Sequence, residues 1–206
     1  MNFARVIIWI LAAVSLWGAD ATITFSRTFP GSVPPFYSVT LSSDGKGVYN
    51  ETKDEDNTEK ITVEPVLVTQ IFQLADKLEH FKKPLESGLK VANMGQKMMR
   101  WENANEKYES KFNYSLNEDA RALADLFDRI GESTRLAVEL ARVMKHDRLG
   151  VDQVTLRIQT AWNNKRLVGR ERLLPLLDQV AKNEALIHMA RERAAQIADA
   201  MRATAQ

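Results

Sequence analysis

Apolar and polar residues alternate in two short stretches near the start of the chain. In residues 22–26, Ile23 and Phe25 would share one face of an extended strand. Residues 36–42 repeat the pattern, with apolar side chains at every second position. This alternation predicts two half-buried β-strands.

Asp44 and Gly45 follow the second of these stretches. A type I′ turn needs positive φ angles at both central residues, which aspartate tolerates and glycine adopts freely. The sequence therefore predicts a hairpin over residues 36–49. The expected cross-strand pairs are Leu41 with Val48 and Thr40 with Tyr49.

A proline-rich segment, Phe-Pro-Gly-Ser-Val-Pro-Pro at residues 29–35, connects the first strand to this hairpin. Its three prolines fix φ and remove backbone donors, so the segment cannot be a central strand. Two interpretations stay open: a rigid recognition loop, or a connection whose composition reflects turn chemistry alone. The polar segment 50–60 is expected to be a solvated loop.

The period of the apolar residues then changes from two to between three and four. Pro65 suits the first turn of a helix, where its missing N–H costs nothing. An apolar stripe follows at Leu67, Ile71, Leu74, Leu78 and Phe81. We expect a helix over residues 64–81, ended by Pro84 and Gly88.

A second strand pair is expected around a turn at residues 103–105. Met99 and Trp101 share a face of the first strand, and Phe112 and Tyr114 lie on the return strand. The aromatic residues of this pair, Trp101, Tyr108, Phe112 and Tyr114, would either stack on a ligand or, more simply, pack a small sheet.

The segment Ser-Leu-Asn-Glu at 115–118 has the pattern of a capping box, in which Ser115 and Glu118 each bond the other's backbone N–H group. The helix expected after it covers residues 117–147. Gly131 is expected to bend or weaken this helix, and Gly150 to end it.

From residue 151 onward only helical spacing remains. Segments 173–182 and 185–203 form a predicted helical hairpin that resembles a single HEAT-type repeat. Because stacked repeats need about three units for a core, we expect it to dock on its neighbours. The last helix carries Ala190, Ala194, Ile197 and Met201 on one face. Its expected partner is the preceding helix, with a second chain as the alternative.

The N-terminal residues have the pattern of a secretory signal peptide. Arg5 precedes an uncharged apolar run at 6–17, and the small-x-small sequence Ala-Asp-Ala follows at 19–21. The run is shorter than the roughly 20 residues of a membrane-spanning helix. We expect residues 1–21 to be removed and the protein to be exported, either to a periplasm or into the medium. An uncleaved membrane anchor is the alternative.

Charge and cysteine content narrow the chemistry. The chain has 28 basic and 27 acidic residues and a net charge of +1, so no electrostatic footprint for nucleic acid is predicted. There is no cysteine, which excludes disulfides, a lipid-modified cysteine, thiolate metal sites and cysteine nucleophiles. An exported domain of this composition must be stabilised by apolar burial.

Candidate catalytic residues are few. His80, His146 and His188 lie on three different predicted helices and lack metal-ligand spacing. The sequence has neither a Gly-x-Ser-x-Gly elbow nor a phosphate-binding glycine loop. A triad or carboxylate pair assembled in space stays open. We assign no catalytic, cofactor-binding or metal-binding residue.

Two charged groups have an ordinary and a functional interpretation. The acidic residues Asp119, Asp125 and Asp128 line the second long helix, where exposure to solvent explains them. The basic residues Lys165, Arg166, Arg170 and Arg172 would contact an anionic polymer or lipid of the cell envelope, or simply form a solvated connection between helices.

The order of a Pro-rich loop, Pro35-Phe36-Tyr37 at the start of a strand, an Asp-Gly turn and a helix resembles a family of exported bacterial proteins classed only as a domain of unknown function. The resemblance covers about residues 22–147. Members of that family often place cysteines just before the Pro-x-Tyr element, whereas residues 31–34 contain none here. The resemblance therefore implies no redox role for this chain, and no activity.

The sequence as a whole predicts an α+β fold in which helices 64–81 and 117–147 pack a small antiparallel sheet. We expect a signal peptide at 1–21, an α+β domain at 22–150 and a helical segment at 151–206. Our hypothesis is an exported interaction or scaffold protein without catalysis, bound to an unknown protein or polymer of the envelope or medium. The alternatives are an envelope hydrolase and a helical oligomerisation module.

Overall fold

The computed structural model describes residues 21–52 and 58–204. The predicted signal peptide therefore lies outside the described residues, except for Ala21, and so do residues 53–57 of the expected loop at 50–60. Within the described ranges, no helix combines the length and the apolar character needed to cross a membrane.

Six antiparallel strands form one sheet in the order β4-β3-β2-β1-β5-β6. The strands are β1 (Thr22–Thr28), β2 (Phe36–Ser42), β3 (Lys46–Asn50), β4 (Glu59–Thr62), β5 (Gln96–Glu102) and β6 (Lys107–Phe112). The helices are α1 (Pro65–Lys77), α2 (Glu118–His146), α3 (Gly150–Asn163), α4 (Arg170–Lys182) and α5 (His188–Ala203), with a short 3-10 turn, η2 (Glu79–Phe81).

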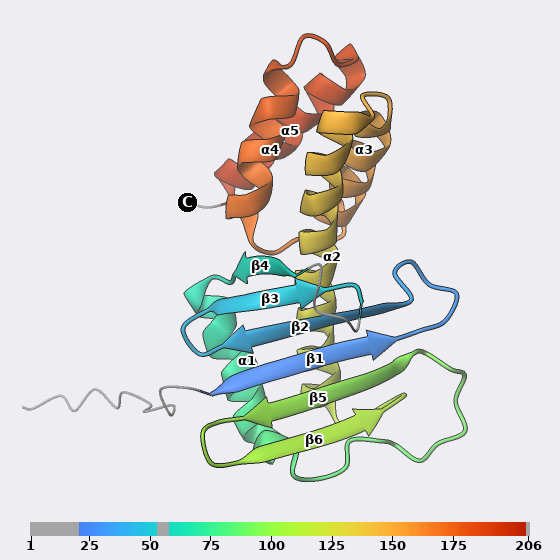
Figure 1. Ribbon diagram of the computed structural model, residues 1–206, viewed down its shortest axis with the longest axis vertical. Helices are drawn as coiled ribbons and strands as arrows, with labels where there is room; N and C mark the ends of the chain where they lie inside the picture. The colour runs from blue at the N-terminus through green and yellow to red at the C-terminus, as the bar shows by residue number, and fades with distance from the viewer. Residues whose placement is uncertain (1–20, 53–57, 205–206) are drawn as a thin grey trace, which may run out of the picture.

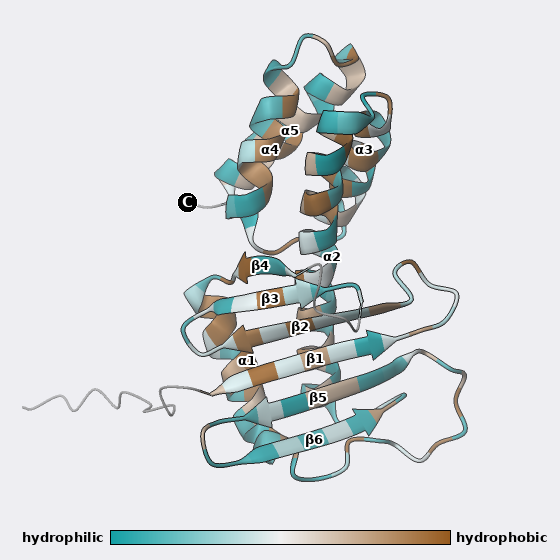
Figure 2. Ribbon diagram, viewed as in Figure 1, coloured by the Kyte–Doolittle hydropathy of each residue, from teal (hydrophilic) through white to brown (hydrophobic). Residues whose placement is uncertain are grey.

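The arrangement confirms the predicted α+β fold. Helices α1 and α2 cover the same face of the sheet, and α2 continues beyond the sheet into a bundle with α3, α4 and α5 (Figure 1). On the covered face, Ile23 and Phe25 are fully buried, as their alternation predicts. In Figure 2, β5 and β6 are coloured mostly from teal to white, which marks these strands as largely polar.

The hairpin β2–β3 is confirmed, but its predicted register is wrong by one residue. Leu41 pairs with Gly47, and Thr40 pairs with Val48. The turn closes through Gly45, whose φ is 83° and whose N–H donates to Ser42 O at 2.9 Å. It is a longer turn with one left-handed glycine, not a two-residue turn. Because a slip of one residue exchanges the faces of a strand, Tyr49 points to the covered face, where it is 3% exposed.

Two elements differ from the prediction next to this hairpin. Strand β4 forms an edge of the sheet in a segment where the sequence predicted a loop followed by a helix. The strand was missed because Ile61 is its only buried side chain, and one buried residue shows no alternation. Helix α1 begins at Pro65 as expected but ends at Lys77, and the three residues of η2 have positive φ. The return strand β6 ends before Tyr114.

The ends of α2 also correct the prediction. The N-cap is Asn117, whose side chain accepts from the Ala120 N–H at 3.2 Å, so the predicted capping box is wrong. Ser115 Oγ instead accepts from the Asn117 N–H at 3.2 Å. Gly150 begins α3 and does not end α2, because its N–H donates to the Asp147 backbone oxygen and to Oδ1, at 3.1 and 3.0 Å.

Helix α2 spans two separate hydrophobic cores. Its first half packs on the sheet and α1, around a core that includes Phe25 and Phe127. Its second half packs against α3, α4 and α5, around a core that includes Leu140 and Ile158. We refer to these parts as the sheet half and the helical half. A single helix therefore fixes the position of one half against the other.

The last two helices form the predicted hairpin. The apolar face of α5 is covered by the chain's own helices α3 and α4, with Ala190, Ala194, Ile197 and Met201 all buried. This is the intramolecular packing that the spacing of these residues favours. The face for which a second chain was the alternative partner is therefore covered within the chain.

Candidate functional site

One face of α2 carries a regular stripe of charged side chains. Steps of three and four residues place on it Asp125, Asp128, Glu132, Arg135, Glu139 and Arg142. This spacing keeps side chains on one side of a helix. From Asp128 onward, the stripe lines two adjoining hollows of about 380 and 600 Å³. We call the two hollows together the loop groove.

The Pro-rich loop forms the opposite wall of the loop groove. The loop is closed by a hydrogen bond from the Phe29 N–H to Pro35 O at 2.8 Å, and inside it the Ser32 N–H donates to Phe29 O at 3.1 Å. Val33 and Pro34 line both hollows, and Val33 is 83% exposed at the tip of the loop. The segment thus connects two strands and also shapes a cleft.

A half-buried polar cluster lies on the floor of the groove. The Tyr37 hydroxyl donates to Asp128 Oδ1, and Arg27 Nη1 donates to Asp128 Oδ2 at 3.1 Å. Arg27 Nη2 also donates to the backbone oxygen of Met94 at 3.0 Å. The Asp128 side chain is only 20% exposed, so the expectation that solvent explains this residue is wrong.

Burial sets the protonation of this cluster. It raises the pKa of Asp128 above its usual value, and the bond from Tyr37 and the charges of Arg27 and Lys97 only partly offset the effect. Burial also raises the pKa of Tyr37, and the neighbouring Asp128 carboxylate raises it further. Tyr37 therefore holds its proton and acts as a hydrogen-bond donor. A tyrosine in this state is not an activated nucleophile.

Gly131 brings the tyrosines close to α2. A Cβ atom at this position would lie 3.0 Å from Tyr37 Cε2 and 3.5 Å from Tyr49 Cε2. Both rings therefore lie against the bare backbone of the helix, one turn from Asp128. The helix is continuous through Gly131, so this glycine provides space and is not a bend or an end.

The second hollow has a different chemistry. The Tyr49 hydroxyl donates to Glu51 Oε1 at 2.9 Å. Burial and the Glu51 charge raise the pKa of Tyr49, while the nearby Arg135 opposes this shift. Val138 and Arg142 continue the wall along α2. This hollow combines aliphatic surface with charged groups, as ligand sites commonly do.

Each carboxylate that lines the loop groove within residues 21–52 and 58–204 accepts a hydrogen bond from another side chain of the protein. Glu51 accepts from Tyr49, Glu59 from Arg172, Asp128 from Tyr37 and Arg27, Glu132 from Arg166, and Glu139 from Arg157. Arg135 and Arg142 form no ion pair or side-chain hydrogen bond with any described residue. The binding capacity left in the groove is therefore cationic.

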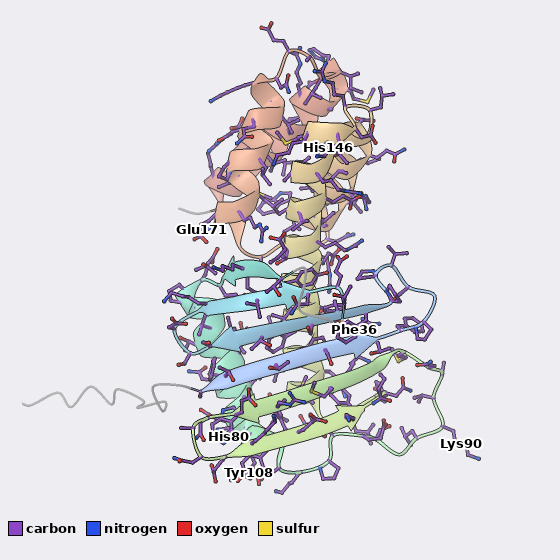
Figure 3. All side chains as sticks on the ribbon, in the orientation of Figure 1. Phe36, His80, Lys90, Tyr108, His146 and Glu171 are labelled. Atoms are coloured by element: carbon purple, nitrogen blue, oxygen red, sulfur yellow. The ribbon has the colours of Figure 1, made fainter. Side chains whose placement is uncertain are left out.

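The predicted candidate residues are not brought together. His80 stacks on Trp101 with ring centroids 4.0 Å apart and bonds Asp76 at 2.8 Å, beside β5 and β6. His146 lies at the far end of α2 (Figure 3), and His188 begins α5. Trp101 and Phe112 are buried, so these two aromatic side chains serve in packing, whereas Tyr108 and Tyr114 are half-buried.

Part of the basic stretch near residue 170 is bound by the protein itself, whereas Lys165 is exposed to solvent as one interpretation expected. Arg166 bonds Asp125 at 2.5 Å and Glu132 at 3.0 Å on α2. Arg172 bonds Glu59 on β4 at 2.6 Å. These side chains tie the helical half to the sheet half, which explains their density without an external partner.

Several residues of the groove escaped the sequence analysis, namely Arg27, Tyr49, Arg135 and Arg142. The three-four spacing of charges along residues 125–142 is a signal that could have found the stripe. The Pro-x-Tyr motif did mark Tyr37, although nothing in it identifies Asp128 as its partner 91 residues away.

Comparison with known proteins adds no assignment: no family model matches the chain, and no curated protein matches it in sequence. The resemblance to an exported bacterial family therefore stays a prediction. Among the residues that the structure describes, no group of three or more histidine, aspartate or glutamate side chains is arranged to hold a metal ion.

Proposed function

We propose that the protein is an exported, non-catalytic binding protein that holds an acidic segment of a partner in the loop groove. The observation that carries this proposal is the charge balance of the groove: among the residues that the structure describes, its five carboxylates accept hydrogen bonds, whereas the guanidinium groups of Arg135 and Arg142 have no such partner. Guanidinium groups bind carboxylates through paired hydrogen bonds.

The spacing of the two arginines defines the ligand further. Arg135 and Arg142 are seven residues apart on one helix, which separates their backbones by roughly 10.5 Å. Val33, Pro34 and Val138 supply aliphatic surface around them. An extended peptide with acidic side chains several residues apart would match both features.

The groove is less suited to hydrolysis. Its buried carboxyl group, Asp128, is bound by Tyr37 and Arg27, and none of the three histidines lines it. A general base would need a free lone pair within reach of a substrate proton. The arrangement therefore favours binding over catalysis.

The test is direct binding of a labelled deca-glutamate peptide to the purified protein, followed by fluorescence anisotropy. We expect saturable binding that weakens with salt, and at least a roughly tenfold loss in the double variant Arg135→Ala/Arg142→Ala. The matched control is Lys145→Ala/Arg148→Ala, which removes two exposed positive charges from the end of the same helix and the turn after it.

Equal binding by the two double variants would show that only net charge matters and would reject the site. Hydrolysis of an envelope substrate by the purified protein, abolished by Asp128→Asn, would reject the non-catalytic assignment. A deca-lysine peptide of the same length should not bind, because it is positively charged, as are the free guanidinium groups of Arg135 and Arg142.

A further inference from the structure

A third hollow, separate from the two of the loop groove, lies where the sheet half meets the helical half. It has a volume of about 290 Å³ and is bordered by β4 and α1 on one side, and by α2 and the start of α4 on the other (Figure 1). We call it the seam cavity. None of the described residues that line it also lines the loop groove. An occupant here would be independent of the function proposed above.

Aliphatic side chains from both halves form the inner wall. Ile61, Val63 and Ile130 are buried beneath the cavity, and Leu67 and Val168 are half-buried at the edge of the sheet-half core. Protein interiors leave few voids larger than a water molecule. A hollow of this size with aliphatic walls leaves apolar surface that a ligand would remove from water.

Two neighbouring hydroxyl groups interrupt the apolar wall. Ser133 and Thr134 are each 6% exposed. Ser133 Oγ accepts from the Val168 N–H at 3.0 Å, and the Thr134 hydroxyl donates to Ile130 O at 2.8 Å. In the part of the chain that the structure describes, the Ser133 proton has no acceptor, so it is available to a ligand.

Polar contacts join the two walls of the cavity. Arg172 Nη2 bonds Glu59 Oε2 at 2.6 Å, and its Nη1 donates to Lys60 O at 3.3 Å. Arg170 Nε lies 4.0 Å from Glu64 Oε1. Each contact links α4 to the sheet half, so together they fix the position of one wall relative to the other. The cavity is thus formed before any ligand enters, as is usual for small-molecule sites.

The hydrogen-bond donors at the cavity favour an acidic head group. Arg172 is bound to Glu59, so the charged groups left at the cavity are Lys60 and the exposed Glu171, which Figure 3 places at the foot of α4. A carboxylate would accept from the Ser133 hydroxyl, whereas an ammonium group brings only donors. We propose that the seam cavity binds a small amphiphile made of an aliphatic chain and a carboxylate, with the chain against the aliphatic wall.

The experiment compares three eight-carbon probes, octanoate, octanol and octylamine, by isothermal titration of the full chain. We expect saturable binding of octanoate, at least about tenfold tighter than octylamine, because the Ser133 hydroxyl and Lys60 can both donate to a carboxylate. Shortening the acid should weaken binding by roughly fourfold per methylene. Lys60→Ala, at an exposed position, should weaken octanoate by about threefold or more and leave octanol unchanged.

A filled cavity gives the second arm of the test. Val168→Phe should abolish octanoate binding, while Val138→Phe, a similar enlargement on the loop groove, should leave it within about twofold. Val168→Phe should also leave deca-glutamate binding unchanged, which separates this proposal from the loop groove and shows that the variant is folded.

Three results would overturn the proposal. Absence of saturable octanoate binding would reject the site. Octanol binding as tightly as octanoate would reject the acidic head group. Full octanoate affinity in a folded Val168→Phe variant would place the binding elsewhere.

Discussion

The sheet half and the helical half share one helix but have different interiors. The sheet-half core contains the fully buried rings of Phe25, Phe72, Phe81, Phe112 and Phe127. The helical-half core is built from leucine, valine, isoleucine, alanine and methionine. The small side chains of Ala190 and Ala194 let neighbouring helices approach closely. Aromatic rings are larger and need a thicker layer between the sheet and its helices, and a buried tyrosine also needs a hydrogen-bond partner for its hydroxyl.

Buried charge is also used differently in the two halves. In the helical half, Arg193 bonds Asp152 Oδ1 at 2.5 Å and Thr155 Oγ1 at 3.2 Å, which joins α5 to α3 inside the bundle. In the sheet half, Asp128 is bound by Tyr37 and Arg27 at the floor of an open groove. The comparison teaches that both halves of α2 combine packing with a wall of the loop groove, whereas only the sheet half places a polar cluster on the floor of that groove.

The largest test of this comparison is whether the halves unfold separately. Phe127→Ala should cost about 3–5 kcal/mol and Leu140→Ala about 2–5 kcal/mol, since both side chains are fully buried on α2. Because one helix belongs to both cores, each variant should lower the stability of both halves together. Fluorotryptophan resonances of Trp101 and Trp162 report the two halves in a denaturant series. A shift of the Trp101 transition alone in Phe127→Ala would break the comparison.

The next effect comes from the groove cluster. Asp128→Ala should cost about 2–3 kcal/mol, because it leaves Arg27 and Tyr37 without their acceptor. Thermal and chemical denaturation at neutral pH measure this loss. Arg193→Met provides the matched measurement in the helical half.

The pH dependence of the same residue has a definite sign. Burial raises the folded-state pKa of Asp128 above the unfolded value near 4. Between these two values the folded state binds the proton and the unfolded state does not, so stability falls as pH rises. The stability of the natural protein relative to Asp128→Asn should therefore be greatest near pH 4 and decline toward pH 7. A difference that grows with pH would contradict the assignment.

A smaller effect is expected from the tyrosines at high pH. Tyr37→Phe should cost about 1–2 kcal/mol at neutral pH, because it removes one hydrogen bond to a charged group. The raised pKa of Tyr37 means that the unfolded state ionises first above about pH 10. The stability advantage of the natural protein over this variant should then shrink as pH rises further.

Chemical denaturation at a series of pH values between about 8 and 11 measures this change, because this range brackets the ordinary pKa of tyrosine. Tyr108→Phe is the control, because it removes an exposed hydroxyl that donates to Glu106 on the edge of the sheet. An advantage over Tyr37→Phe that persists unchanged at high pH would show that Tyr37 ionises as freely as in the unfolded chain.

The periodic parts of the fold could be predicted from the sequence, because burial on one face leaves a repeated signal. The stripe of α1 and the alternation of β1 are examples. Strand β4 has one buried side chain and left no such signal. The hairpin register depends on whether Tyr49 faces in or out, which the pocket beside Gly131 decides. That pocket forms only when α2 packs against the sheet, so the sequence of the hairpin alone does not reveal it.

The site could be predicted only in fragments. The loop and Tyr37 were singled out by composition and motif, but Asp128 and Arg27 are 101 residues apart and meet only because α2 crosses the ends of the strands. The basic residues near 170 attracted attention for their density, yet their partners lie on α2 and β4. Local charge patterns thus identify side chains that need partners without identifying the partners.

The smallest expected effect concerns Gly131, where the two halves of α2 meet. In an ordinary exposed helix, glycine to alanine stabilises by about 1 kcal/mol. Here the new Cβ would lie 3.0 Å from Tyr37 Cε2, and that ring is held by its bond to Asp128. Gly131→Ala should therefore fail to stabilise and cost up to about 1 kcal/mol. In a Tyr37→Leu background the ring is gone, so the same change should become stabilising. The sign reversal across this double-mutant cycle, measured by chemical denaturation, distinguishes a glycine that makes room for a ring from one that merely weakens a helix.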